Sequence, residues 1–255
     1  MTVKDIDRDS IRHGKITEKP LREKPGFPTW AMKLTMAITG IIFGGFVLVH
    51  MIGNLKIFMP EITDGGEFKY HIDEYGHFLR TMGAPILPEE TVLWIFRITL
   101  LVAIVLHIWC AFALHGRARV SRGKFARKNL MGGLNSFTAR TMIVTGVVLL
   151  LFIIFHILDL TMGVQPAAPA GFEEGAIHAN MIASFSRPGV AIWYILAMVV
   201  LFLHLSHGLF TAVSDLGITG HRWRAVLLFI SYLVPAAVMV GNISIPLAIA
   251  TGLIS

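Results

Sequence analysis

Five histidines lie in long apolar stretches of this 255-residue chain: His50, His107, His156, His204 and His207. An imidazole in a hydrocarbon environment has lost its water, so an ionisable residue at such a position predicts a functional site. The chemistry open to a buried imidazole is ligation of a metal or haem iron, proton transfer, or a hydrogen bond to a neighbouring helix. Choosing among these requires the helices that carry the histidines.

The composition indicates an integral membrane protein. Hydrophobic residues make up 55% of the chain and charged residues only 15%, whereas soluble domains carry about 25% charged residues. The net charge of +6 is concentrated in particular loops, so we expect it to set membrane topology and expect no nucleic-acid partner. The single cysteine, Cys110, allows neither an internal disulfide nor a multi-thiolate metal site.

Five apolar runs are each long enough to cross a hydrocarbon core of about 30 Å, which takes about 20 helical residues. They cover residues 29–58, 91–116, 139–163, 189–216 and 224–253. The runs are too long, and alternate too little, for barrel strands. We therefore predict an all-α membrane protein, with one five-helix transmembrane bundle over residues 30–255 and a polar extension over residues 1–29.

Loop charge predicts the orientation of the bundle. Seven basic residues lie in the second connection, at positions 117–140, and Arg222 and Arg224 lie in the fourth, whereas the first connection is mainly acidic. Short basic loops stay on the cytoplasmic side. We expect the N-terminus in the cytoplasm and the C-terminus outside.

With this orientation the histidines fall at two depths. His50 lies eight residues before position 58 and His156 seven before position 163, about 10 to 12 Å from the outer ends of their helices. His107 and His207 each lie nine residues before an inner helix end, at about 13 to 14 Å. Depth alone does not choose between His204 and His207, because they differ by only about 4.5 Å along the helix.

Two layers of two histidines, each drawn from two helices, favour ligation of two haem b groups. Haem is held by imidazoles from facing helices of a bundle, and filling both axial positions leaves the iron to transfer electrons. A zinc or copper ion would need three or four ligands at one level. Glycines near the histidines would let a macrocycle, or simply a neighbouring helix, approach the backbone; they are Gly40, Gly44, Gly45, Gly53 and Gly208.

Three segments carry a family resemblance. They are MAITGIIFGGFVLVHMIGNLKIF (36–58), YGHFLRTMGAPILP followed by LWIFRITLLVAIVLHIWCAFAL (75–114), and LHLSHGLFTAVSDLG (203–217). Together with the order of histidines over five spans, they resemble the five-helix, di-haem cytochrome b558-type membrane anchor of succinate:quinone and quinol:fumarate oxidoreductases. The resemblance covers nearly the whole chain from about Trp30 onward.

The resemblance implies a set of haem-iron ligands. His50 and His156 would hold a haem distal to the catalytic subunits, and His107 and His207 a proximal one. His207 is selected because the family's ligand on the fourth helix directly precedes a glycine, here Gly208. His204 would then be a neighbour of the ligands or a partner of a haem propionate.

The resemblance also implies partners and a place of action. A flavoprotein that interconverts succinate and fumarate, a reaction of the tricarboxylic acid cycle, and an iron–sulfur subunit would dock on the cytoplasmic face of a bacterial inner membrane. This chain would carry electrons between the iron–sulfur subunit and the membrane quinone, for which menaquinone is the expected species. It would contribute no catalytic residue to the succinate chemistry, and a higher oligomer is allowed.

Further polar residues are candidates for quinone, proton or propionate contacts. Asp159, Asn54 and Arg97 lie near the outer helix ends, although Asp159 could instead pair with Arg97 or cap its helix. On the inner side, propionates or a second quinone pocket would be served by His115, Arg117, Arg119 and Arg222. Snorkelling to lipid phosphate is the alternative for these inner residues.

Two other interpretations stay open at this point. One is a cytochrome b anchor of another quinone-linked complex, such as a hydrogenase or a formate dehydrogenase. The other is a haem-free membrane transporter or structural anchor whose histidines relay protons. A spectroscopic assay for b-type haem separates the second interpretation from the rest.

Overall fold

The computed structural model describes residues 26–63, 68–122 and 133–254, and these residues form helices and connections without a strand. The five long helices are α2 (Thr29–Asn54), α4 (Thr91–Arg122), α5 (Gly133–Leu160), α7 (Pro188–Asp215) and α8 (His221–Ala250). Three short helices join them, namely η1 (Leu55–Phe58), α3 (His71–Thr81) and α6 (Ile177–Phe185). Most of the predicted N-terminal extension, residues 1–25, lies outside the described residues.

Each of the five long helices is long and apolar enough to cross a membrane, so the predicted all-α, multi-pass bundle is confirmed. Their bounds agree with the predicted runs to within a few residues, except around the second connection. There α4 continues to Arg122 and α5 begins at Gly133. Arg, Ala and Val after position 116 do not break a helix, so the helical pattern outlasts the apolar one.

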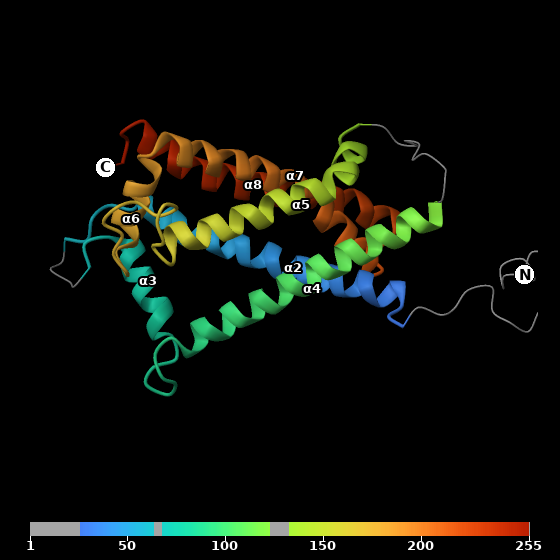
Figure 1. Cartoon of the computed structure of the whole chain (residues 1–255), viewed down its shortest axis with the longest axis horizontal. Helices are drawn as coiled ribbons and strands as arrows, with labels where there is room; N and C mark the ends of the chain where they lie inside the picture. The colour runs from blue at the N-terminus through green and yellow to red at the C-terminus, as the bar shows by residue number, and fades with distance from the viewer. Residues whose placement is uncertain (1–25, 64–67, 123–132, 255) are drawn as a thin grey trace, which may run out of the picture.

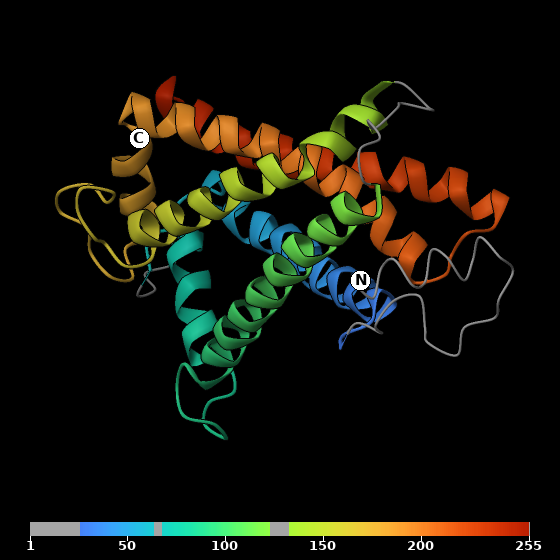
Figure 2. The same cartoon turned by 45° about the vertical axis from the view of Figure 1, so that its right-hand side comes forward.

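The five long helices run back and forth in chain order (Figure 1). One end of the bundle carries α3, α6 and the end of α8, and we call it the C-terminal end. The opposite end, where α2 begins, is the N-terminal end. Helix α7 packs against α8, α2 and α5, whereas α4 packs mainly against α2. Figures 1 and 2 show α4 leaning away from α7 and α8 toward the C-terminal end, where α3 connects it to α2.

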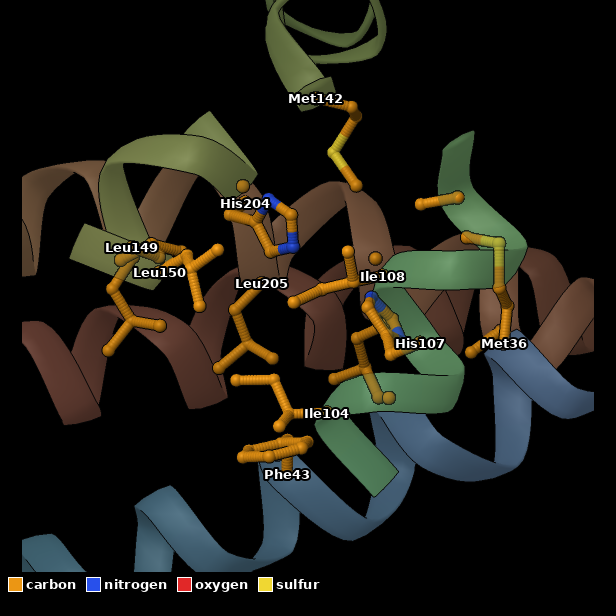
Figure 3. A pocket seen from close by; sticks show the side chains of 18 of the residues that line it. Met36, Phe43, Ile104, His107, Ile108, Met142, Leu149, Leu150, His204 and Leu205 are labelled. Atoms are coloured by element: carbon orange, nitrogen blue, oxygen red, sulfur yellow. The ribbon is translucent and has the colours of Figure 1, made fainter. Parts of the chain in front are cut away.

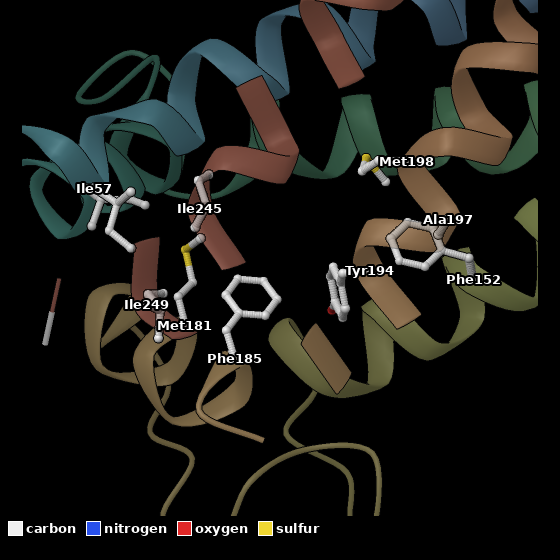
Figure 4. Packing of buried hydrophobic residues seen from close by; sticks show 10 residues of the cluster. Ile57, Phe152, Met181, Phe185, Tyr194, Ala197, Met198, Ile245 and Ile249 are labelled. Carbon is white, nitrogen blue, oxygen red and sulfur yellow. The ribbon is translucent and has the colours of Figure 1, made fainter. Parts of the chain in front are cut away.

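A hydrophobic core closes the C-terminal end of the bundle (Figure 4). It joins Ile57 of η1, Phe152 of α5, Phe185 of α6, Tyr194 of α7 and Ile245 of α8, all at most 8% exposed. Burial of large apolar side chains stabilises such a contact by about 1.5 to 3 kcal/mol each. The core therefore fixes the start of α7 against α5, and with it the position of Tyr194.

Polar contacts join the helices at the N-terminal end. Arg117 of α4 donates to the Phe27 carbonyl (2.7 Å) and to Thr29 Oγ1 (3.0 Å). Lys33 of α2 forms an ion pair of 3.2 Å with Asp215 at the end of α7. These contacts hold α4 and α7 to α2 at this end of the bundle.

Candidate functional site

The histidines predicted for the outer level are brought together by α2 and α5. The rings of His50 and His156 lie with their centres 5.8 Å apart and their planes at 87°. Phe46 stacks on His50 at 5.3 Å and Phe152 on His156 at 5.8 Å, each four residues earlier on the same helix. One helical turn separates such residues, so each histidine is supported by an aromatic ring of its own helix.

A second pair of rings lies nearer the N-terminal end. His107 of α4 and His204 of α7 have ring centres 6.5 Å apart, with the planes inclined by 59°. Both project into one cavity of about 290 Å³ (Figure 3). Pockets for small organic ligands begin at about this volume.

The cavity is walled by α2, α4, α5 and α7, almost entirely with apolar side chains. Its lining includes Gly40, Gly44, Gly146 and Gly208, one or more from each of α2, α5 and α7. A Cβ atom added at Gly40 would lie 3.6 Å from His107 Cε1, and one at Gly146 would lie 3.4 Å from His204 Cε1. The glycines thus keep open the space into which the two imidazoles project.

Hydroxyl groups determine which nitrogen of the inner imidazoles is free. Thr39 Oγ1 donates to the Thr35 carbonyl (2.7 Å) and lies 3.0 Å from His107 Nδ1. Thr145 Oγ1 donates to the Thr141 carbonyl (3.0 Å) and lies 3.0 Å from His204 Nδ1. Each hydroxyl has one hydrogen, already used, so its oxygen accepts from Nδ1–H. The Nε2 lone pair of each ring is then available as a ligand.

His207, the ligand that the resemblance implies, lies beside α5. Its Nδ1 lies 3.5 Å from Thr138 Oγ1 on α5. The cavity that contains the His107 ring is lined by His204 and Gly208. Geometry therefore favours His204 as the partner of His107, whereas the prediction from the resemblance favours His207.

Near the outer pair, Asp159 is fully buried and fully hydrogen-bonded. Arg187 Nη2 donates to its Oδ1 (2.7 Å), Tyr194 Oη donates to its Oδ2 (2.9 Å), and Ser184 Oγ lies within 2.7 Å of both oxygens. Tyr194 Oη also lies 3.3 Å from His156 Nδ1. The sequence suggested that Asp159 could pair with Arg97 or cap its helix. Its ion-pair partner is instead Arg187.

Sequence reasoning missed Ser184, Arg187 and Tyr194. A carboxylate in an apolar helix needs a cation, and that was a signal to search the neighbouring segments for one. Arg187 lies in the connection that directly precedes α7, 28 residues after Asp159. Nothing in the local sequence marks it as the partner.

The other predicted polar residues lie apart from this network. Asn54 ends α2, and the Arg97 guanidinium lies over the Trp94 ring at 4.9 Å. His115 is exposed on α4. Arg119 and Arg222 are also exposed at the N-terminal end, and Arg117 binds the start of α2.

Within the described ranges, no three His, Cys, Asp or Glu side chains converge to hold a metal ion by themselves. The buried imidazoles instead meet in pairs. No family model, curated protein or solved structure matches this chain.

Proposed function

We propose that this chain is a di-haem cytochrome b membrane anchor of a succinate dehydrogenase or fumarate reductase. The observation that carries the proposal is that four imidazoles meet as two pairs, at two levels of one membrane bundle. His50 and His156 would hold one haem b, and His107 with His204 or His207 the other. Bound haem with two imidazole ligands supplies one-electron transfer at the iron.

The ring separations support this assignment. In each pair two imidazoles lie close enough together that both could bind one metal ion. The observed separations are 5.8 Å for His50 and His156 and 6.5 Å for His107 and His204. The apolar cavity beside the second pair, with glycine on three of its four helices, offers space for a flat apolar ligand.

The proton positions support it as well. Thr39, Thr145 and Tyr194 each accept from a histidine Nδ1–H, which leaves Nε2 of His107, His204 and His156 free. Ligating histidines ordinarily donate their second ring N–H in this way. A proton-relay role would instead favour a chain of groups that exchange protons along the membrane normal.

The partners and the bacterial inner membrane are those that the resemblance implies, and the charge at the N-terminal end supports a docking side for them. Arg119, Arg222 and Arg224 are exposed there, so under the positive-inside rule we propose that this end faces the cytoplasm. An iron–sulfur subunit and a flavoprotein subunit would dock on it. Electrons would pass through this chain to or from quinone in the membrane.

The role of Asp159 in quinone chemistry is less favoured than it was from the sequence. Its two oxygens already receive hydrogen bonds from Ser184, Arg187 and Tyr194, and it is 0% exposed. A group that binds quinone must offer a free donor or acceptor. Asn54 and Arg97 remain the candidates near the C-terminal end.

A haem assay on the purified complex tests the proposal. We expect a pyridine haemochrome spectrum of b-type haem with two haems per chain, and succinate-dependent reduction of quinone in membranes. Absence of b-type haem would overturn the proposal in favour of a haem-free transporter or anchor. Two haems with hydrogen- or formate-dependent reduction would instead indicate an anchor of a different quinone-linked complex.

A further inference from the structure

Tyr194 connects a buried charge to one of the proposed iron ligands. Its side chain is 6% exposed and lies among the rings of Phe152 (5.1 Å, 86°) and Phe185 (4.8 Å, 81°), as Figure 4 shows. The edge-on packing holds the phenol ring in one orientation. The hydroxyl is thereby held between Asp159 and His156.

The direction of the hydrogen bonds follows from Asp159. Asp159 forms an ion pair with Arg187 at 2.7 Å, and a carboxylate in an ion pair offers acceptors only. The single phenol hydrogen therefore goes to Oδ2, and the phenol oxygen accepts from His156 Nδ1–H. His156 is left with its Nε2 lone pair on the side of the ring away from Tyr194.

This arrangement differs from the one at the inner pair. There the hydroxyls of Thr39 and Thr145 donate to neutral backbone carbonyls. At His156 the hydroxyl donates to a carboxylate, and charge-assisted hydrogen bonds are about twice as strong as neutral ones. A phenol polarised by a carboxylate is the better acceptor, and it draws more electron density onto the imidazole.

We infer that Tyr194 is a positioning residue for His156, which fixes the ring with Nε2 free for iron and makes it a more basic ligand. The inference rests on the proposed function. A more basic axial ligand stabilises ferric iron, so Tyr194 lowers the reduction potential of the haem held by His50 and His156. Asp159 acts through Tyr194, and Arg187 and Ser184 hold Asp159 in place.

The test is Tyr194→Phe in the complete complex, followed by redox titration of both haems and electron paramagnetic resonance of the ferric state. Phenylalanine keeps the ring packing, and Asp159 retains Ser184 and Arg187. We expect both haems to remain, the midpoint potential of one to rise and its low-spin signal to shift, and the other haem to be unchanged. Loss of an outer hydrogen bond to a ligand weakens metal binding by about 10- to 100-fold, so this haem should also dissociate more readily.

Tyr75→Phe is the matched control, because it removes a phenol hydroxyl at the same end of the bundle. The Tyr75 ring lies against Gly53 and beneath Lys56, and phenylalanine preserves both contacts. Both haem potentials should match those of the unmodified complex.

A second variant keeps the inference testable if Tyr194→Phe does not assemble. Asp159→Asn retains the shape of the side chain and removes its charge, and it should raise the potential of the same haem. Unchanged potentials and resonance signals in a haem-loaded variant would overturn the inference. Absence of haem from the unmodified complex would overturn the proposed function instead.

Discussion

At the scale of single residues, three of the imidazoles share one hydrogen-bond arrangement. His107, His156 and His204 each donate Nδ1–H to a hydroxyl oxygen whose own hydrogen is used elsewhere. At His107 and His204 this arrangement involves no charged group. At His156 it involves one carboxylate, Asp159, which is paired with Arg187. Each ring is thus oriented before a ligand binds, which reduces the entropy lost on binding.

The identity of the inner ligand gives the first prediction. We expect His204→Ala to remove the same haem as His107→Ala, because these two rings project into the same cavity. His207→Ala should retain both haems, since its Nδ1 contact is with Thr138. Reduced-minus-oxidised spectra and haem counts of the three variants decide the matter. Loss of a haem in His207→Ala, with both retained in His204→Ala, would restore the assignment that the resemblance implies.

The choice between His204 and His207 shows where prediction from the sequence stopped. Three residues along a helix turn the side chain through nearly a full circle and move it by about 4.5 Å, so both histidines share a face and nearly a depth. The two histidines are distinguished by the packing of α5 against α7 and by the ring of His107, which lies beside His204. That packing depends on side chains more than 50 residues away in the chain.

At the scale of helices, glycine residues leave room for the cavity between α2, α4, α5 and α7. Gly146→Leu would direct a side chain of four carbons at His204, whose Cε1 lies 3.4 Å from the position of the first one. We expect this substitution to abolish binding of the inner haem and to leave the outer haem in place. The haem content of the purified complex measures the result.

Gly45→Leu is the control for the cavity variant. A Cβ atom at Gly45 meets nothing within 4 Å, and the residue is exposed on α2. Both haems should be retained. If Gly146→Leu also retained both, the cavity would not be the haem site.

The contact between α3 and α6 predicts a pH dependence. The His178 ring stacks on Tyr70 with centres 3.6 Å apart, and its backbone N–H donates to Asp73 Oδ1 (2.9 Å). Burial lowers the pKa of His178 below its ordinary value of about 6.5, with Asp73 opposing and Lys69 reinforcing the shift.

Because the folded state favours neutral His178, the contact is fully stable above pH 6.5 or so and weakens as the pH falls below it. Amide hydrogen exchange in α6 should quicken over that range. His178→Phe should remove the pH dependence and keep the backbone bond to Asp73. Equal exchange in α6 at neutral and acidic pH in the unmodified protein would contradict the prediction.

The long helices were predictable and the short ones were not. An apolar run of 20 residues is a strong signal, and α2, α7 and α8 begin within three residues of the predicted positions. Helices α3 and α6 have 11 and 9 residues, too short for a membrane-span criterion. They are stabilised by contacts with each other, with η1 and with the long helices around them, which the sequence does not display.

At the scale of the whole molecule, cysteine labelling tests the proposed orientation, because the one natural cysteine is buried. Cys110 is 0% exposed, so an introduced cysteine is the accessible thiol among the described residues. Ile86 is 91% exposed in the connection before α4, so in intact cells Ile86→Cys should react with a membrane-impermeant reagent. Arg119→Cys should react only after the membrane is opened. If Arg119→Cys reacted in intact cells and Ile86→Cys did not, the bundle would have the opposite orientation in the membrane.

Much of α4 faces away from the other helices. Trp94, Phe96, Leu101, Trp109 and Phe112 are each about half or more exposed. Large aromatic and aliphatic side chains are favourable among lipid acyl chains, and tryptophan is also enriched at the membrane–water interface. The helix is therefore both a wall of the cavity and a boundary with the surrounding membrane.

The position of α7 in the chain has a consequence for biosynthesis. His50 and His156 are both present once α5 has been synthesised, but Tyr194, which orients His156, is on α7. His204, which faces His107, is on α7 too. A ribosome delivers α7 after α2, α4 and α5, so both sites reach their final form at one step. Under the proposed function, haem would therefore be bound only after the fourth long helix has entered the membrane.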